Sequence, residues 1–361
     1  MRVLIDIGHP AHVHYFHYFI KIMERQGHQI LVVARDKEVS QELLSDYGIR
    51  YVSRGSGASG LLGKFFYLIK ANYIIMKEAL NFKPDIFISF ASPYAAQVSW
   101  LLRKDHISFT DTEHAALGSL AFMPFTSVIV TPKSFRKKLG KKHFSFNGFM
   151  EQTYLDNKYF CTENVTKLLG LKNNEKYILL RFVSWDASHD IGHTGLHDSA
   201  KLELVRTLSK TFRIFISSEA PLSKDFQAYK ISIPASKMHH VLASASLFLG
   251  EGATMASECA MLGTPAIYIN SLNAGTLIDQ ELGGCIFGFR NSTGVLEKAN
   301  ELLSGDALTD TFKKRSKILL KNTIDVTAFM VWLVENYPDS IETMTKNPEY
   351  LNKLPRSSNA S

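Results

Sequence analysis

The chain has 361 residues, of which 45% are apolar and 21% charged, and this composition excludes an intrinsically disordered protein. The length allows about two domains, and three scattered cysteines exclude a disulfide framework or a cysteine-rich zinc site. The net charge of +7 is uneven: residues 1–150 hold 19 Lys and Arg against 11 Asp and Glu, whereas residues 151–361 hold 22 against 23. This asymmetry indicates an acidic partner for the first half, such as nucleic acid, an anionic membrane surface or an anionic ligand.

Short apolar runs alternate with helical segments through the first half. Residues 2–8 are typical of a buried parallel strand, and residues 13–25 have helical spacing. Further strands are expected at 30–34, 85–90, 106–109 and 128–130, with a helix around 93–102. This alternation predicts an open, mostly parallel α/β sheet.

The pattern pauses at residues 147–151 and then restarts. Strands are expected at 177–182, 213–217, 247–250 and 266–269, and helices at 201–211, 238–244, 254–262, 295–303 and 307–332. We therefore predict two doubly wound, Rossmann-like domains that face a crevice, where ligands bind at the carboxyl ends of the strands. The expected domains are residues 1–150 and 151–340, the second including a C-terminal helix that crosses back. Residues 341–361 are expected to form a tail, of which the polar residues 345–361 are loosely ordered.

The most informative segment is residues 247–269, where a strand ends in a glycine-rich turn and a helix follows. The small residues Gly252, Ala253 and Thr254 would let a phosphate approach the backbone N–H groups at the start of this helix. Glu258, one turn further on, would accept both hydroxyls of a ribose. The alternative is an ordinary strand-to-helix turn with Glu258 as an exposed helix residue.

Residues 240–269 and the two-half layout resemble the nucleotide-sugar enzymes of the GT-B fold. The likeness is to the N-acetylglucosaminyl transferase that makes lipid II and to the non-hydrolysing UDP-N-acetylglucosamine 2-epimerases. The whole chain resembles a poorly characterised bacterial and archaeal family related to both. The resemblance implies that the second half binds the nucleotide, that the helix 254–262 faces its diphosphate and that Glu258 holds its ribose.

The turn after the first expected strand contains Gly8, His9 and His12. It resembles the glycine-rich first loop of the lipid II transferase, which ends in a histidine matching His12, but His9-Pro10 stands here in place of glycines. A neutral histidine is a plausible general base for a sugar hydroxyl, so His12, and after it His9, are candidate catalytic residues. Alternatively, these histidines cap or pack the following helix.

Two carboxylates, Asp111 and Glu113, follow the expected strand 106–109. Their mutual repulsion would separate their pKa values and suit them to acid–base chemistry. The position resembles the acidic loop of the 2-epimerases, where a glutamate matching Glu113 takes part in catalysis, although the rest of the epimerase pattern is not evident in residues 115–124. The alternative is helix capping by Asp111 or Thr112.

The same resemblance implies further ligand contacts after strands of the second half. GT-B enzymes bind the diphosphate at the loop that follows the first of these strands, which implies this role for Arg181 and Ser184. They contact the donor sugar after the strand matching 266–269, which implies this role for Asn273 and Gln280, with a surface loop as the equal alternative. His189, His193 and His197 are spaced four apart, but glycines interrupt them and no carboxylate completes a metal-ligand pattern. We expect neither metal nor cofactor, because the helix dipole and basic side chains would stabilise the leaving diphosphate.

Two features of the basic half bear on its partners. Residues 61–82 mix aromatic and aliphatic side chains with lysines, and residues 133–142 hold six basic residues. This composition suits an anionic membrane surface, but a partly buried helix with a solvated basic loop is equally consistent with it. Nucleic acid is disfavoured because no recognised nucleic-acid-binding module is present.

Three functions follow from these features. The favoured one is a GT-B glycosyltransferase that moves a sugar from a nucleotide-sugar donor, UDP-linked by expectation, to a surface polysaccharide or lipid-linked glycan. The alternatives are a UDP-sugar 2-epimerase and a non-catalytic nucleotide-sugar-binding scaffold. Residues 1–10 do not have the pattern of a signal peptide, so we expect a cytoplasmic protein, either free or peripheral on the inner face of the plasma membrane.

Overall fold

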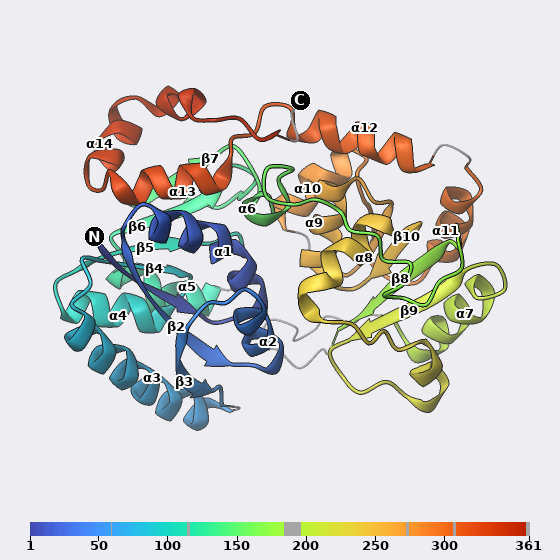
Figure 1. Cartoon of the computed structure of the whole chain (residues 1–361), viewed down its shortest axis with the longest axis horizontal. Coiled ribbons are helices and arrows are strands. Elements are labelled where there is room, and N and C mark those ends of the chain that lie inside the picture. The colour runs from blue at the N-terminus through green and yellow to red at the C-terminus, as the bar shows by residue number, and fades with distance from the viewer. Residues whose placement is uncertain (59, 114–115, 184–195, 272–273, 306–307, 359–361) are drawn as a thin grey trace. The chain divides into compact units, whose positions relative to one another are not determined.

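The structure is a computed structural model that describes residues 1–58, 60–113, 116–183, 196–271, 274–305 and 308–358 (Figure 1). The chain divides into two compact units. Unit 1 comprises Met1–Tyr154 and Thr323–Ser357, and unit 2 comprises Leu155–Asn322 with residues 358–361. The second segment of unit 1 includes residues 323–340, which the sequence-based boundary assigns to the second domain.

Unit 1 is built on a seven-stranded parallel sheet with the order β3-β2-β1-β4-β5-β6-β7. The strands are β1 (Arg2–Ile7), β2 (Gln29–Asp36), β3 (Tyr51–Ser56), β4 (Ile86–Phe90), β5 (Asp105–Phe109), β6 (Val128–Pro132) and β7 (His143–Phe146). The helices are α1 (Pro10–Arg25), α2 (Glu38–Asp46), α3 (Leu61–Phe82), α4 (Pro93–Leu101), α5 (Ala116–Phe122), α6 (Gln152–Leu155, which ends one residue into unit 2), α13 (Val326–Glu335) and α14 (Asp339–Lys346). Central strands such as β1 and β4 are buried on both faces, which explains their continuous apolar sequences.

Unit 2 is built on a five-stranded parallel sheet with the order β12-β11-β10-β8-β9. The strands are β8 (Tyr177–Phe182), β9 (Arg213–Ser218), β10 (Leu247–Gly250), β11 (Ala266–Ile269) and β12 (Phe287–Phe289). The helices are α7 (Asp198–Leu208), α8 (Met238–Ser244), α9 (Ala253–Leu262), α10 (Gly275–Leu282), α11 (Val295–Leu303) and α12 (Leu308–Leu320). The predicted α/β class, with two doubly wound parallel sheets, is confirmed.

The long helix expected at 307–332 is in fact two helices. The chain breaks between α12 and α13, where the Asp325 side chain accepts a hydrogen bond from the Ala328 N–H at 2.9 Å and so caps α13. At the same break, the Ile324 N–H donates to the Asn147 carbonyl at 2.9 Å. These polar contacts end one helix and start the next, which packs against α1 in unit 1 (Figure 1).

The expected tail 341–361 is wrong for its first part, because residues 339–346 form α14. Ser340 and Met344, four residues apart, share the buried face of this helix. The Ser340 hydroxyl donates to the Leu333 carbonyl at 2.7 Å, which ties α14 to α13. The polar appearance of the segment reflects the solvent-facing side of an amphipathic helix.

Acidification is expected to destabilise unit 1 through His106 of β5. This ring is fully buried, with Nε2 2.9 Å from the Ser89 hydroxyl and Nδ1 3.0 Å from the Thr126 hydroxyl, and burial lowers its pKa to about 3. The unfolded chain takes up this proton near pH 6.5, so the stabilisation is complete above that pH and is lost as the pH falls toward 3. Going from about pH 7 to about pH 5 should cost about 2 kcal/mol, measured by urea unfolding.

The variant His106→Gln tests this assignment because it keeps a hydrogen-bonding side chain that does not titrate. Its stability should depend less on pH between about 7 and 5, by the amount that one histidine contributes. Gln29→Ser, which changes an exposed residue without a titratable group in the same unit, is the control and should keep the wild-type dependence. Equal pH dependence of wild type and His106→Gln would contradict the prediction.

Candidate functional site

The carboxyl ends of β1, β4 and β5 form the candidate site in unit 1. The turn after β1 leads into α1, whose N-cap is His9, and the His9 Nδ1 atom accepts from the Ala11 N–H at 3.3 Å. His9 therefore caps the helix, as the alternative interpretation proposed, and its catalytic role stays a prediction. Because β1, β4 and β5 are neighbours and parallel, the loops that follow them lie at one edge of the sheet.

His12 lies at this edge, in the first turn of α1. Its ring is half-buried, 4.7 Å from the Phe90 ring and 6.2 Å from the Tyr15 ring. Burial lowers its pKa well below 6.5, with the charges of His9, Arg54 and Lys37 acting in the same direction, so the ring is neutral at physiological pH.

The tautomer of His12 follows from its backbone contact. The Nδ1 atom accepts from the Gly8 N–H at 3.4 Å, so Nε2 carries the proton of the neutral ring. In this state Nε2 is a hydrogen-bond donor. His12 is therefore better suited to orient a substrate oxygen than to remove its proton.

Asp111 follows β5 and has the properties of a general base. Its Oδ1 atom accepts from the Thr112 hydroxyl at 3.2 Å, and its side chain also forms a hydrogen bond with Tyr15. Burial raises its pKa to about 6; the hydrogen bonds oppose this rise, and the Glu113 charge reinforces it. A carboxylate with a pKa near the working pH is an effective proton acceptor.

Tyr15 lies between these two candidates and was not predicted as a site residue from the sequence. Its ring stacks near His12 and its side chain binds Asp111, so it couples two residues that are far apart in the sequence. The available signal was its position three residues after His12, which places both side chains on one face of α1.

Glu113 has a structural role at the same edge of the sheet. Its Oε1 atom accepts from the Arg136 N–H at 2.7 Å, and the Lys137 ammonium donates to its backbone carbonyl at 2.7 Å. These contacts hold the start of the basic segment 133–142 against the acidic loop. A catalytic role for Glu113 stays a prediction.

A buried ion pair lies beneath the His12 turn and was also missed. Asp6 of β1, fully buried, accepts from the Arg54 Nε atom at 2.7 Å and from the Ser92 hydroxyl. A Cβ placed on Gly8 would lie 3.4 Å from the Arg54 Nη2 atom, so the guanidinium sits directly beside the turn. The signal in the sequence was a charged residue, Asp6, inside an otherwise apolar strand.

The candidate donor site lies in unit 2, where β10 ends and α9 begins. Gly250 has no room for a side chain, because a Cβ there would lie 2.7 Å from the Arg181 Cβ atom. Gly252 is the N-cap of α9, Ala253 is exposed and Thr254 is half-buried, so the first turn of the helix is accessible. A helix N-terminus with accessible N–H groups attracts a phosphate.

Arg181 packs beside this turn, with its Cγ atom 3.5 Å from a Cβ placed on Gly252. Its guanidinium donates to the Ser217 hydroxyl at 2.8 Å and forms an ion pair with Glu219 at 2.6 Å. Arg181, the predicted diphosphate ligand, therefore lies close to the start of α9. In this structure its guanidinium is paired with the exposed carboxylate of Glu219.

The Glu251 side chain also organises this region, a role that was not predicted from the sequence. It is buried, and its carboxylate accepts from the Val183 N–H at 3.1 Å and the Leu196 N–H at 2.6 Å. Its own backbone carbonyl accepts from the Asn270 amide at 3.2 Å. Glu251 thereby connects the ends of β8, β10 and β11.

Glu258 and Gln280 are both buried, whereas the alternative interpretations placed Glu258 on an exposed helix surface and Gln280 in a surface loop. The Glu258 Oε1 atom lies 3.0 Å from the His239 Nε2 atom, and His239 itself is buried in α8. Gln280 is fully buried and its amide donates to the Ser257 hydroxyl at 2.7 Å, which braces α10 against α9. The predicted contacts of Glu258 with the ribose and of Gln280 with the sugar stay predictions. Both alternative interpretations, which required exposed side chains, are wrong.

Two further candidates, Ser184 and Asn273, lie outside the described residues, as do His189 and His193. Among the residues that the structure does describe, no group of three or more His, Cys, Asp or Glu is arranged to hold a metal ion. Within the same part of the chain, no helix is both long and apolar enough to cross a bilayer.

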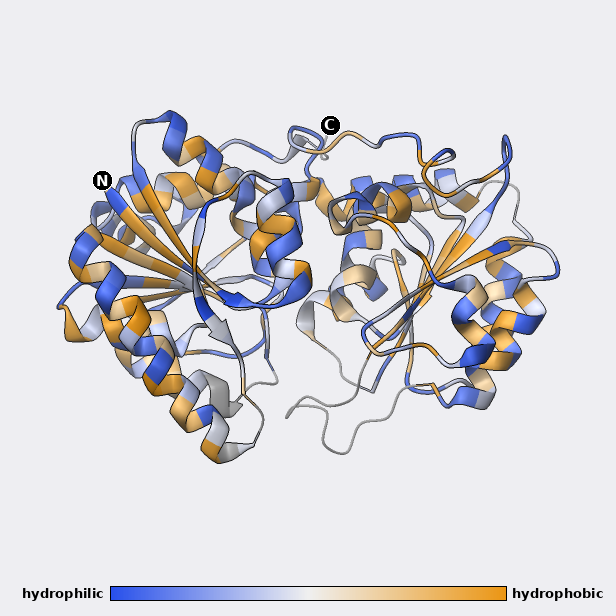
Figure 2. Cartoon of the chain, turned by 60° about the horizontal axis from the view of Figure 1, so that its bottom comes forward, coloured by the Kyte–Doolittle hydropathy of each residue, from blue (hydrophilic) through white to orange (hydrophobic). Residues whose placement is uncertain are grey.

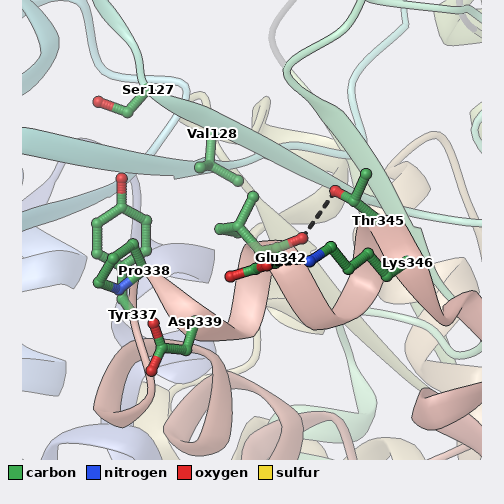
Figure 3. Close-up of a pocket in the computed structure, with 9 residues that line it drawn as sticks. Ser127, Val128, Tyr337, Pro338, Asp339, Glu342, Thr345 and Lys346 are labelled. Atoms are coloured by element: carbon green, nitrogen blue, oxygen red, sulfur yellow. Dashed lines mark hydrogen bonds and ion pairs between the residues drawn. The ribbon is translucent and has the colours of Figure 1, made fainter.

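A cavity of about 420 Å³ in unit 1 is separate from the candidate site. It lies where β6 starts, at the amino edge of the sheet, and Tyr337 and helix α14 form its other wall (Figure 3). Two of its lining residues, Glu342 and Lys346, pair with each other along α14. The cavity therefore opens at the edge opposite to His12 and Asp111.

Two Rossmann-like units, each built on a parallel sheet of doubly wound order, define the GT-B class of fold. Residues 1–280 match the family described as "Protein of unknown function (DUF354)", and the chain belongs to this family. It is similar to "Uncharacterized protein MJ0665" of Methanocaldococcus jannaschii, with 24% identity over 278 residues that cover 74% of this chain and 81% of the relative.

Solved structures with the same fold include both classes of enzyme considered above. The UDP-GlcNAc 2-epimerase of Neisseria meningitidis bound to UDP-GlcNAc superposes with a TM-score of 0.64 and 11% identity, over 88% of this chain and 98% of the epimerase. The glycosyltransferase SsfS6 of Streptomyces sp. SF2575 superposes with a TM-score of 0.59 and 12% identity, over 93% of this chain and all of the transferase (100%). At such identities the likeness shows the fold alone.

Proposed function

We propose that this protein is a glycosyltransferase that moves a sugar from a nucleotide-sugar donor, UDP-linked, to a surface polysaccharide or a lipid-linked glycan. The observation that carries the proposal is Asp111, a carboxyl group with a pKa of about 6 that is joined through Tyr15 to the neutral His12. Unit 1 supplies the base, and unit 2 supplies the donor site.

In this reaction, Asp111 accepts the proton of the acceptor hydroxyl while that oxygen attacks the anomeric carbon of the donor sugar. The bond from this carbon to the diphosphate breaks, and the nucleoside diphosphate leaves. Attack from the face opposite the leaving group inverts the anomeric centre. The His12 Nε2–H group orients the acceptor oxygen, which lowers the entropic cost of the reaction.

The start of α9 holds the donor in this proposal. Gly252, Ala253 and Thr254 present backbone N–H groups to the diphosphate, and Arg181 adds a planar cation once it exchanges Glu219 for phosphate. The helix dipole stabilises the charge that develops on the leaving group. The nucleotide sugar is a substrate, so the proposal assigns no metal or cofactor to the reaction.

If the start of α9 binds the donor, a substitution there should change how strongly a nucleotide sugar raises the Tm of the protein. UDP-, GDP-, CMP- and dTDP-sugars are compared by thermal shift, because a ligand that binds the folded state raises Tm according to its affinity. We expect a UDP-sugar to give the largest shift and Ala253→Glu to abolish it, since a carboxylate at the exposed helix start repels phosphate. Ala253→Ser is the matched control and should keep the shift. An unchanged shift in Ala253→Glu would remove α9 from the donor site.

A 2-epimerase is the second candidate, because Asp111 and Glu113 place two carboxyl groups on one loop. The two functions separate when the protein is incubated with UDP-N-acetylglucosamine alone. We expect no conversion without an acceptor and release of UDP when glycan or lipid-linked acceptor is added. Formation of the 2-epimer without acceptor would overturn the transferase proposal. Donor binding without turnover on any acceptor would identify a scaffold.

A further inference from the structure

Helix α3 has two apolar faces, and only one of them packs on unit 1. The inner face carries buried residues spaced four apart, namely Tyr67, Ala71, Ile75 and Ala79. The outer face carries large apolar side chains that are each more than half exposed, namely Leu62, Phe66, Ile69, Tyr73 and Leu80. At 3.6 residues per turn, the outer set falls within one narrow arc opposite the inner set. Figure 2 shows the apolar colouring along this helix.

The neighbouring helices also expose apolar side chains. The Asn72 amide donates to the Gln97 side chain at 2.7 Å, and the Gln97 amide donates to the Ala121 carbonyl at 3.3 Å, so α3, α4 and α5 lie side by side. Trp100 and Leu101 of α4 and Leu120 of α5 are also more than half exposed. Exposed apolar side chains on three adjacent helices are typical of an interaction site.

The charges on α3 identify the kind of partner. Lys64, Lys70 and Lys77 are exposed, and Glu78 is the one acidic residue in the sequence of this helix. Lys70 and Lys77 lie along one flank of the apolar stripe. Aromatic and aliphatic side chains flanked by lysines suit the interface of an anionic bilayer. In a symmetric pairing of two copies, the same lysines would face each other and repel.

We propose that the outer face of α3 docks onto the surface of an anionic lipid bilayer. The helix lies in the interfacial plane, its aromatic side chains enter the headgroup region, and its lysines contact lipid phosphates. The helix does not need to span the bilayer for this mode of binding.

The inner face of α3 connects this surface to the candidate site. The Tyr67 hydroxyl contacts the Arg54 Nη1 atom at 2.5 Å and donates to the Gly55 carbonyl at 3.1 Å. Arg54 in turn pairs with Asp6 beneath the His12 turn. The first turns of α3 therefore lie at the carboxyl edge of the sheet. If the proposed function holds, docking through α3 brings a lipid-linked acceptor toward Asp111; the docking itself does not depend on that function.

The basic run 133–142 is not part of this surface. Its start is tied to the acidic loop by Lys137, whereas the Lys142 ammonium donates to the Thr126 carbonyl at 2.8 Å, at the amino edge of the sheet. The run links β6 to β7, at the end of the sheet opposite β3, and α3 packs against β3. We therefore assign membrane contact to α3 and not to the basic run.

Flotation of the full chain with lipid vesicles tests the proposal. Wild type should float with vesicles of phosphatidylcholine and phosphatidylglycerol and bind pure phosphatidylcholine more weakly. The double variant Phe66→Ser/Tyr73→Ser should bind the mixed vesicles about ten-fold or more weakly, because two large apolar groups leave the interface. The control Leu282→Ser/Ile318→Ser removes equally exposed apolar side chains from unit 2 and should bind like wild type.

A second pair of variants separates charge from apolar contact. Lys70→Gln/Lys77→Gln should weaken binding to mixed vesicles several-fold and make it less sensitive to salt, while Lys137→Gln/Lys138→Gln should leave it unchanged. No flotation of wild type, or equal flotation of all α3 variants, would overturn the proposal. A wild-type dimer that Phe66→Ser/Tyr73→Ser converts to monomer, without vesicle binding, would identify a second copy as the occupant.

The failure of the docking proposal is distinguishable from failure of the proposed function. The α3 variants should keep the UDP-sugar thermal shift and the turnover of a water-soluble acceptor, since neither needs a bilayer. A variant that loses vesicle binding and keeps both readouts supports docking. A variant that keeps the wild-type unfolding transition but loses the thermal shift together with vesicle binding would show that α3 has another role, and would overturn the proposal.

Discussion

Asp111→Asn is expected to lower kcat for sugar transfer by about 10²–10⁴-fold, the range that a general base contributes. The amide keeps the size of the side chain and cannot accept the proton of the acceptor hydroxyl. The measurement is the initial rate of nucleoside diphosphate release at saturating donor and acceptor. In wild type, kcat/KM should fall as the pH drops below about 6, because the Asp111 carboxyl group, whose pKa is raised to about 6, becomes protonated.

The Tyr15→Phe variant tests the same assignment through the pH profile. The hydrogen bond from Tyr15 lowers the pKa of Asp111, so its removal should move the acidic limb to higher pH while leaving appreciable turnover above it. Asp85→Asn, at the amino edge of the same sheet, is the matched control and should keep the wild-type rate. If Asp111→Asn retains the wild-type rate and His12→Ala abolishes it, the base is His12 and the tautomer inferred from the Gly8 contact is wrong.

The central strands could be predicted from the sequence because parallel strands buried on both faces are continuous apolar runs. β4 and β10 are examples, and both follow the expected pattern. The strand β3 has the sequence YVSRGS and β7 the sequence HFSF, and both lie at the ends of the sheet, where polar residues interrupt the apolar run. Neither strand was predicted, because neither has a continuous apolar run.

The candidate site was predictable only as far as local sequence determines it. A turn after a parallel strand lies at the carboxyl edge of its sheet, so His12, Asp111 and Gly252 could be placed there without a structure. Arg54 could not, since its partner Asp6 is 48 residues away and belongs to another strand. The burial of Glu258 likewise depends on His239 of the neighbouring helix. Tertiary contacts of this kind leave no local pattern.

The Asp6–Arg54 pair predicts a large loss of stability when one partner is removed. Arg54→Met should lower the free energy of unfolding of unit 1 by about 3–5 kcal/mol, because Asp6 is left as an uncompensated buried charge. Urea unfolding of the full chain measures this loss, and Arg50→Met, which changes an exposed arginine next to β3, should have little effect. A loss for Arg54→Met no larger than that of the control would show that water reaches Asp6.

The double variant Asp6→Asn/Arg54→Met distinguishes the charge from the packing of the guanidinium. With the carboxylate replaced by a neutral amide, the buried charge disappears, so the double variant should be more stable than Arg54→Met alone. The Arg54 guanidinium also packs 4.5 Å from the Tyr94 ring, and this contact is lost in both variants. The difference between them therefore isolates the cost of the unpaired charge. Because Arg54 also lowers the pKa of His12, both variants should bring that pKa closer to 6.5, observable by NMR titration of the ring.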